Sequence, residues 1–337
     1  MVAGTKSDDV LVGDAGDNRL DGLDGNDRLS GLGGNDLLIG GAGADVLDGG
    51  DGIDLASYYT SAAGVAVNLA SHSASGGEAQ GDTLIGIEDL EGSDWNDTLT
   101  GNSDDNWLYG LDGNDRLMGG GGDDVLTGGA GADTLDGGAG YNAAFYAWSL
   151  AGVAVNLATG AAEGGDAQGD VLLQIANLIG SDFADLLGGD AGDNVLYGND
   201  GADKLWGNDG DDILNGGAGA DSLYGGAGYN AASYVGSSAG VAVNLATGAA
   251  EGGDAQGDLL YQITDLFGSN FADLLGGDAG DNVLYGNGGA DKLWGNGGDD
   301  ILRGGAGGDT LYGGAGENMA SYLGSSAGVA VNLATGA

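Results

Sequence analysis

The sequence predicts an all-β protein, a right-handed parallel β-roll (β-solenoid) of stacked 18-residue coils. Three observations predict this fold: a nine-residue unit recurs in register, glycine occupies its turn positions, and leucine recurs once per unit. The 337 residues include 78 glycines but neither proline nor cysteine, which is not the composition of an ordinary globular protein. Internal repeats are therefore the first feature to define.

The chain repeats with a period of 88 residues and contains a little under four copies. Each copy holds six consecutive nine-residue units and then a spacer of 34 residues. The predicted arrays cover residues 4–57, 92–145, 180–233 and 268–321. The predicted β spacers cover residues 58–91, 146–179 and 234–267, and a partial spacer covers residues 322–337.

Within the arrays the unit is G-G-x-G-x-D-x-L-x, as in residues 40–48. Among the 24 units, position 1 is always glycine, position 4 is glycine in 19, and position 6 is aspartate in 17 and asparagine in seven. Position 8 is leucine in 20 units and alanine in the last unit of each array. We expect glycine at positions 1 and 4 to supply the positive φ angles of a tight turn, and x-L-x to form a minimal strand. Two units then make one coil, with leucine between two narrow parallel sheets.

The spacers also predict β structure. Residues 64–69 alternate apolar with small or polar side chains, the pattern of a half-buried strand, and the pattern recurs at Val153, Val241 and Val329. A turn and a short apolar segment follow at residues 76–87. We expect the solenoid to continue through each spacer with altered coils.

The formal net charge is −45, from 52 acidic residues against seven lysines and arginines. This charge excludes a nucleic-acid surface that tracks phosphates and adhesion to anionic lipid through basic residues. No apolar run approaches a membrane span, and residues 1–10 lack the pattern of a secretory signal. Cations are the expected partners.

Stacked position-6 carboxylates indicate why a cation is needed. Coils about 4.8 Å apart hold the carboxylates of alternate units at roughly that separation, where two charges repel by about 3 kcal/mol at an effective dielectric of 20. Without cysteine, no disulfide can stabilise the fold. A divalent cation between adjacent turns converts the repulsion into coordination. The ligands on offer are oxygens, which suit several bound Ca²⁺ ions better than Mg²⁺ or Zn²⁺.

The nonapeptides resemble the RTX, or haemolysin-type, calcium-binding repeats of proteins exported by bacterial type I secretion, and the resemblance covers all four arrays. The spacers are similar to those of long RTX adhesins and surface proteins, and of alginate-epimerase repeat modules. The resemblance implies that each Ca²⁺ is held by position-6 side chains of units n and n+2 together with turn carbonyls. It pairs Asp115 with Asp133, Asp203 with Asp221, and Asp291 with Asp309. The predicted ligands are Asp27, Asp36, Asp45, Asp54, Asp115, Asp124, Asp133, Asp203, Asp212, Asp221, Asp291, Asp300, Asp309, Asn106, Asn194 and Asn282.

Two departures from the repeat refine this expectation. The first unit of arrays two to four has Trp95, Phe183 or Phe271 in place of glycine, so its aspartate is outside the predicted set. Units 2, 4 and 6 of these arrays carry asparagine, aspartate and asparagine at position 6. One edge of the roll is therefore expected to bind Ca²⁺ more weakly than the other, because it has fewer charged ligands.

Two further sets of residues leave alternatives open. Aromatic residues at position 9 are compatible with a flat strip for a sugar chain or a protein, and equally with shielding of a thin roll; they are Tyr197, Trp206, Tyr224, Tyr285, Trp294 and Tyr312. Acidic residues of the spacer turns form either an extra calcium site or a solvated turn; they are Glu78, Asp166 and Asp254 with Asp82, Asp170 and Asp258.

No enzyme is expected. The G-x-S-x-G strings at residues 236–240 and 324–328 match a hydrolase nucleophile motif but lack its strand–turn–helix context, and His72 is the only histidine. We expect a structural or adhesive segment of a secreted bacterial protein, extracellular or at the cell surface, that folds on extracellular Ca²⁺. One alternative is a self-assembling filament or surface layer, joined end to end through an unpaired last coil. Another is a carbohydrate-binding repeat module of a polysaccharide-modifying enzyme.

Overall fold

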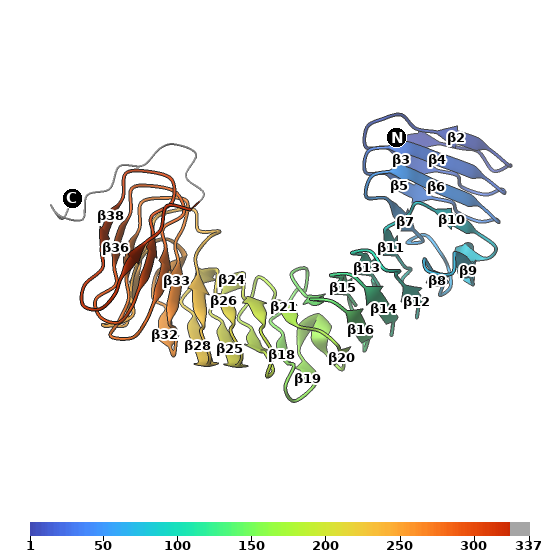
Figure 1. Cartoon of the computed structure of the whole chain (residues 1–337). Coiled ribbons are helices and arrows are strands. Elements are labelled where there is room, and N and C mark those ends of the chain that lie inside the picture. The colour runs from blue at the N-terminus through green and yellow to red at the C-terminus, as the bar shows by residue number, and fades with distance from the viewer. Residues whose placement is uncertain (324–337) are drawn as a thin grey trace. The chain divides into compact units, whose positions relative to one another are not determined.

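The computed structural model describes residues 1–323 and contains two compact units, Met1–Ser181 and a second that begins at Asp182 (Figure 1). Within these residues there is no α-helix, and most strands are three residues long. The middle residue of a typical strand is buried while its neighbours are not, as the x-L-x pattern predicts. Most of the predicted partial spacer, from residue 324 onward, lies outside the described residues. The G-x-S-x-G string at residues 324–328 and the predicted strand at Val329 fall in this part.

In the first unit, one parallel sheet runs along a single face of the roll. It contains, in spatial order, β1 (Val2–Ala3), β3 (Arg19–Asp21), β5 (Leu37–Ile39), β7 (Leu55–Ser57), β11 (Asp89–Glu91), β13 (Trp107–Tyr109), β15 (Val125–Thr127), β17 (Ala143–Phe145) and β21 (Asn177–Ile179).

The opposite face of the first unit is divided into separate sheets. One has the order β10 (Thr83–Ile85), β6 (Val46–Asp51), β4 (Arg28–Gly33) and β2 (Val10–Val12). Another has the order β20 (Val171–Leu173), β16 (Thr134–Ala139), β14 (Arg116–Gly121), β12 (Thr98–Thr100), β8 (Ala66–Asn68) and β9 (Ser73–Ser75). The strands β18 (Ala154–Asn156) and β19 (Ala161–Glu163) form an antiparallel hairpin.

The second unit repeats this arrangement. One face has β23 (Val195–Tyr197), β26 (Ile213–Asn215), β29 (Ala231–Ser233), β33 (Asp265–Phe267), β35 (Val283–Tyr285), β37 (Ile301–Arg303) and β39 (Met319–Ala320). The other has β22 (Leu186–Gly188), β25 (Lys204–Asp209), β28 (Ser222–Ala227) and β32 (Leu259–Tyr261), and then β31 (Ala249–Glu251), β30 (Ala242–Asn244), β34 (Leu274–Gly276), β36 (Lys292–Trp294) and β38 (Thr310–Tyr312). Two turns pair through β24 (Asp200–Gly201) and β27 (Ala218–Gly219).

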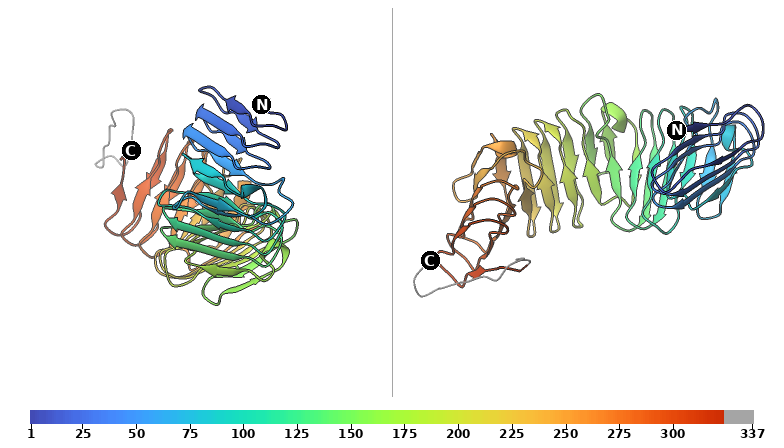
Figure 2. Two further views of the ribbon diagram at one scale, coloured as in Figure 1. Left: turned by 90° about the vertical axis from the view of Figure 1, so that its right-hand side faces the viewer. Right: turned by 90° about the horizontal axis from the view of Figure 1, so that it is seen from above.

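Consecutive coils are in 18-residue register, and their stacking within each unit is visible in Figure 2. Arg19 pairs with Leu37, and Val195 pairs with Ile213. The position-8 leucines lie between the two faces and are almost all fully buried, as at Leu20 (0% exposed). The predicted fold class, an all-β parallel roll of 18-residue coils, is confirmed.

Each spacer continues one face of the roll and interrupts the other. β7 pairs directly with β11, β17 with β21, and β29 with β33, so this face runs through the spacers. On the opposite face, β10 closes the sheet of the preceding array, whereas the hairpin β8–β9 opens the next sheet against β12. Leu55 pairs with Asp89, 34 residues later, instead of 18. The surplus forms the hairpin and a 3₁₀ turn, η1 (Gly77–Ala79) in the first spacer, with η2 (Gly165–Ala167) and η3 (Gly253–Ala255) in the next two.

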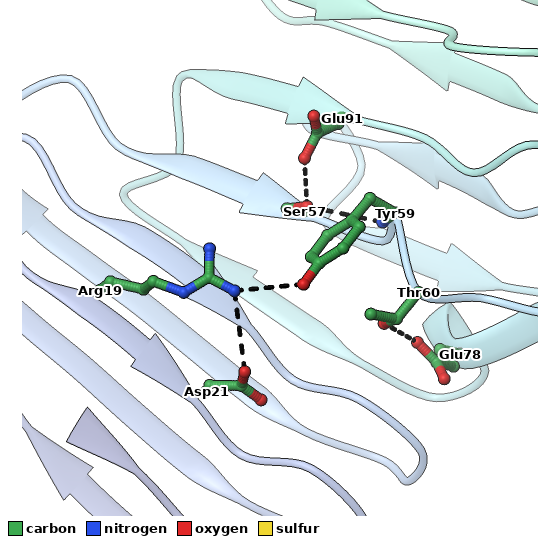
Figure 3. Close-up of polar contacts among 7 residues, drawn as sticks. All are labelled: Arg19, Asp21, Ser57, Tyr59, Thr60, Glu78 and Glu91. Atoms are coloured by element: carbon green, nitrogen blue, oxygen red, sulfur yellow. Dashed lines mark hydrogen bonds and ion pairs between the residues drawn. The ribbon is translucent and has the colours of Figure 1, made fainter. Parts of the chain in front are cut away.

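Polar contacts join the first spacer to the array before it (Figure 3). Arg19 on β3 donates a hydrogen bond to the hydroxyl of Tyr59 (3.2 Å) and lies 3.8 Å from the carboxylate of Asp21. Ser57 on β7 donates to the carboxylate of Glu91 on β11. The start of the spacer is thus held both by an earlier coil and by the strand that continues the sheet.

Candidate metal centres

Turns of alternate units stack on one another, and their position-6 side chains form a regular ladder. In each predicted pair, the backbone N–H of the earlier aspartate donates to Oδ1 of the later one. The distances are 2.7 Å from Asp115 to Asp133, 2.8 Å from Asp203 to Asp221, and 3.1 Å from Asp291 to Asp309. The structure therefore brings each sequence-predicted pair together, with one carboxylate oxygen already hydrogen-bonded.

In twelve of the described turns, the second carboxylate oxygen of the position-6 aspartate, Oδ2, is buried and has no hydrogen-bond partner. An unpaired buried oxygen of this kind is unfavourable unless another group satisfies it. The set belongs entirely to the predicted ligands, and the remaining predicted aspartate, Asp309, is partly exposed. Within residues 1–323 the set is Asp27, Asp36, Asp45, Asp54, Asp115, Asp124, Asp133, Asp203, Asp212, Asp221, Asp291 and Asp300.

This oxygen faces a small space beside the first glycine of its own turn. A methyl group built on Gly22 would collide with Asp27 Oδ2 and would lie 2.5 Å from the carbonyl oxygen of Gly40, one coil later. Gly207 has the same surroundings, with Asp212 Oδ2 and the Gly225 carbonyl oxygen. A carboxylate oxygen from one coil and a carbonyl oxygen from the next therefore line a space that any side chain at position 1 would fill.

The glycine at position 1 is needed for this space and not for its backbone angles, which corrects the sequence-based expectation. Among residues 1–323, no position-1 glycine has a positive φ. Positive φ values occur at positions 2 and 4 instead, as at Gly41 (89°) and Gly25 (136°). Tight contact with the neighbouring coil, and not turn conformation, thus requires glycine at position 1.

The turns fall into two classes according to position 2. In units 3 to 6, position 2 has a positive φ even where it is not glycine, as at Leu111 (77°) and Asn199 (70°). In the first two units of an array it does not, and its N–H donates to the position-6 side chain, as from Thr5 to Asp9 Oδ2 (2.5 Å). The left-handed conformation at position 2 is therefore what leaves Oδ2 unpaired in the later units.

The predicted asparagine ligands lie in the second unit of their arrays, where the position-2 N–H donates to the position-6 side chain. Asn106 Oδ1 accepts the N–H of Asn102 (2.7 Å), and its Nδ2 donates to the Glu88 carbonyl (2.7 Å). Asn194 and Asn282 accept the corresponding N–H groups of their own turns (2.7 and 2.8 Å). Asparagine Oδ1 lies beside the position-1 glycine, where aspartate Oδ2 lies in later units. These residues present one neutral oxygen there and no charge.

Asp97, which the sequence set omits, has both carboxylate oxygens hydrogen-bonded. Val65 N donates to Oδ1 (2.6 Å) and Ser93 N to Oδ2 (2.5 Å). Asp273, at the equivalent position of array four, accepts from Val241 and Ser269 in the same way. Its omission from the predicted ligands agrees with this geometry.

Replacing Leu32 by asparagine is expected to raise the free energy of unfolding by about 1 kcal/mol, because leucine at a φ of 77° carries a left-handed backbone cost that asparagine lowers. Leu32 is 53% exposed, so little apolar burial is lost. At the equivalent position of array three, Asn208 also donates Nδ2 to the carbonyl of Gly189 (2.9 Å). Thermal unfolding in saturating Ca²⁺ measures the change. Leu150→Asn, at a residue 88% exposed and without a positive φ, is the control, and an equal shift there would contradict the backbone argument.

Side chains at position 5 form a second ladder, which is not among the sequence-based predictions. Here the side chain of the earlier coil accepts from the backbone N–H of the later one: Asn26 N donates to Asp8 Oδ1 (2.9 Å), and Ala44 N donates to Asn26 Oδ1 (3.0 Å). This direction is opposite to that of the position-6 ladder, so the two ladders connect neighbouring turns from both sides. The available signal is Asp or Asn at position 5 in the first four units of arrays one and two, replaced by other residues in the last two.

Burial raises the pKa of several position-6 carboxyls, because desolvation disfavours the charged form. The pKa of Asp115 rises to about 8 through burial, with the neighbouring charges of Asp133 and Asp97 adding to it. Burial and the charges of Asp221 and Asp185 raise the pKa of Asp203 to about 8 as well. Without a cation, Asp115 and Asp203 therefore retain protons close to neutral pH, and a divalent ion would replace those protons.

The donor set fits Ca²⁺. Within residues 1–323, no group of three or more His, Cys, Asp or Glu side chains is placed to hold a metal ion. Side chains alone do not complete a site, so backbone carbonyls must contribute, as the Gly40 and Gly225 carbonyls are placed to do. An all-oxygen set of carboxylates and carbonyls matches the preference of Ca²⁺.

The acidic residues of the spacer turns separate into two kinds. Glu78 is partly exposed and accepts a hydrogen bond from Thr60 (2.6 Å; Figure 3). Asp82 is buried and accepts from the hydroxyl of Tyr58 (3.2 Å), as its equivalents in the next two spacers do from Tyr146 and Tyr234. Burial, together with the adjacent aspartate, raises the pKa of all three tyrosines well above the usual value, so they remain hydrogen-bond donors.

Several of the position-9 aromatic residues stack on a neighbouring ring, whereas Tyr285 meets Phe267 edge-on (84°). The rings of Trp206 and Tyr224 are 5.6 Å apart and nearly parallel (10°), and Tyr261 continues the stack at 4.7 Å. Stacked rings cover each other's faces, so they present edges and not a flat platform to solvent. Trp294 stacks on Tyr312 in the same way (5.8 Å, 8°), and its other strand partner is Gly276, as Gly188 is for Trp206. The Trp294 ring also borders a pocket of about 190 Å³ that includes Asn244.

The motifs considered for catalysis lie in turns. Ser238, at the nucleophile position of residues 236–240, is exposed. Its neighbour Ser237 is buried, donates to the Ala239 carbonyl (2.8 Å) and accepts the Asp254 N–H (3.0 Å). The next element is the strand β30 and not a helix. His72 is an exposed turn residue with a φ of 51°.

Comparison with known proteins agrees with this geometry. The family model described as RTX calcium-binding nonapeptide repeat (4 copies) matches residues 2–29, 21–56, 82–117, 109–143, 179–214, 197–230, 267–302 and 294–319. A search of curated proteins found no match. Among residues 1–323, no helix has the length and apolar character needed to cross a membrane. Because the matched segments cover more than half of the sequence and contain the turns described above, the chain belongs to the family of RTX calcium-binding nonapeptide repeat proteins.

Proposed function

We propose that the chain is a calcium-dependent structural segment of a secreted bacterial RTX protein, which folds on extracellular Ca²⁺ and supports adhesive or other parts of that protein. One observation carries the proposal: buried, unpaired carboxylate oxygens recur along the stack, each beside a position-1 glycine. A cation satisfies these oxygens only when neighbouring coils are stacked. Ion binding and folding are then one event.

The proposed location is extracellular or at the cell surface. Sites with one or two carboxylates and several carbonyls are expected to be weak, with dissociation constants of roughly 10⁻⁴–10⁻³ M, as in extracellular calcium modules. Cytosolic Ca²⁺ is too dilute to fill such sites, so the chain would stay unfolded there and pass a type I secretion channel as an extended chain. Folding without cysteine suits either compartment.

Small-angle X-ray scattering of the full chain in calcium buffers tests the proposal. At roughly 10⁻⁷ M free Ca²⁺ we expect the radius of gyration of an unfolded chain, and at roughly 10⁻² M that of a folded one. The transition midpoint should lie near roughly 10⁻³ M. A chain already folded at the lower concentration would contradict folding after export.

The other roles stay predictions. For carbohydrate binding, the candidate contact in the described second unit is the pocket that Trp294 and Asn244 line. Self-assembly end to end, and a difference in affinity between the two edges, are open to electron microscopy and to calcium titration.

A further inference from the structure

The ladder formed by units 1, 3 and 5 of an array continues into the spacer. Asp45 N donates to Asp82 Oδ1 at 2.8 Å, which matches the contact between aspartates within the array. The same link joins Asp133 to Asp170 (2.8 Å) and Asp221 to Asp258 (2.9 Å). The spacer aspartate therefore takes the place that position 6 of a seventh unit would take.

The second oxygen of this spacer aspartate is in a different environment from its counterparts in the array. In the second spacer, the hydroxyl of Tyr146 donates to Asp170 Oδ2 at 2.9 Å, and in the third, Tyr234 donates to Asp258 Oδ2 at 3.1 Å. Both partners are buried, with Tyr146 2% and Asp170 4% exposed. In the arrays the equivalent Oδ2 atoms are unpaired.

The surroundings of the equivalent glycine also differ from those in the arrays. Five residues before Asp258, where position 1 would lie, is Gly253. A methyl group built there would meet Ser237, the Ala239 carbonyl oxygen (2.7 Å) and Val241, and not the carboxylate of Asp258. The second oxygen of the spacer carboxylate instead accepts a hydrogen bond from a tyrosine hydroxyl.

We propose that this buried tyrosine ends the row of calcium ions: its hydroxyl proton occupies the position that the array leaves for a cation, so that Asp82, Asp170 and Asp258 hold no ion. A carboxylate that accepts one backbone N–H and one phenol O–H has no unsatisfied oxygen, and the ladder ends without an uncompensated buried group. The spacer tyrosine thereby limits how many ions an array binds. This inference rests on the proposed calcium-dependent function.

The test is a count of bound Ca²⁺ on the full chain, by equilibrium dialysis and elemental analysis at saturating Ca²⁺. Asp170→Asn is expected to leave the count unchanged. The matched change Asp115→Asn, at an aspartate whose Oδ2 is unpaired, is expected to lower it by one. Circular dichroism in Ca²⁺ checks that both variants are folded.

Tyr146→Phe provides a second arm, because it leaves Asp170 Oδ2 without its donor, as in the arrays; the count is expected to rise by one. A lower count for Asp170→Asn, or an unchanged or lower count for Tyr146→Phe, would overturn the inference. An unmodified chain that binds no Ca²⁺ would instead overturn the proposed function, so the two failures are distinguishable.

Discussion

In excess chelator, the chain is expected to lack β structure at a pH of about 8 and to gain it as the pH falls toward about 5. Burial raises the pKa of Asp115 and Asp203 to about 8, and that of Asp45 to about 6, above the value of 3.8 for an exposed aspartate. The folded chain therefore binds more protons than the unfolded chain between these pH values. Stability from protonation is fully present below a pH of about 4 and is lost as the pH rises through about 6 to 8.

Far-UV circular dichroism measured against pH in chelator, and again in millimolar Ca²⁺, checks this expectation. With Ca²⁺ present, the chain should be β-structured at both pH values. The apparent affinity for Ca²⁺ should fall on acidification, because the ion must displace these protons. Raising the ionic strength in chelator at a pH of about 8 is the control, since it screens exposed charges but does not satisfy buried carboxylates. A chain that is fully β-structured in chelator at this pH would contradict the account of the unpaired carboxylates.

Replacing Gly110 by alanine is expected to remove one bound Ca²⁺ and to lower the free energy of unfolding in Ca²⁺ by about 1–3 kcal/mol. The added methyl group would collide with Asp115 Oδ2 and with the Gly128 carbonyl oxygen, the two oxygens that line this space. It would occupy the space without satisfying either oxygen. Chemical denaturation at fixed free Ca²⁺, together with a count of bound ions, measures both effects.

Gly121→Ala is the matched control in the same array. Its nearest non-neighbouring atom is Ser103 Cα, 3.9 Å from the added methyl group, and the residue does not have a positive φ. No bound ion should be lost, and the stability should change by less than about 0.5 kcal/mol. If the two variants behaved alike, general loss of glycine flexibility, and not the space beside position 1, would explain the effect.

The regular part of the fold can be predicted from the sequence because the nine-residue units repeat the same pattern of glycine, aspartate or asparagine, and leucine. Alternate units place a leucine 18 residues apart, as at Leu20 and Leu38, and both are fully buried in adjacent strands. A one-residue slip would move each leucine to the solvent face. Period, register, core and the pairing of position-6 aspartates are all readable from such spacing.

Other features depend on contacts between coils, which single positions do not reveal. Leu23 and Asn199 adopt the left-handed conformation because their neighbours in the stack require it, and no residue preference predicts this for leucine. Trp95 in place of glycine sets the turn of Asp97 apart in the sequence, but only the structure shows that Ser93 and Val65 saturate Asp97, whereas Asp115 keeps an unpaired oxygen. The same difference explains why Asp170 looks like a ligand in the sequence and is closed by Tyr146 in the structure.

The amino-acid pattern thus suffices for the coil, its leucine core and the choice of Ca²⁺, because these depend on local periodicity and on the type of donor atom. The three-dimensional arrangement determines which carboxylate oxygens remain unpaired, since each oxygen is satisfied or left open by groups one coil away, and in the spacer by a tyrosine 24 residues distant in the chain. It also explains the glycine at position 1, where the neighbouring coil approaches too closely for a side chain.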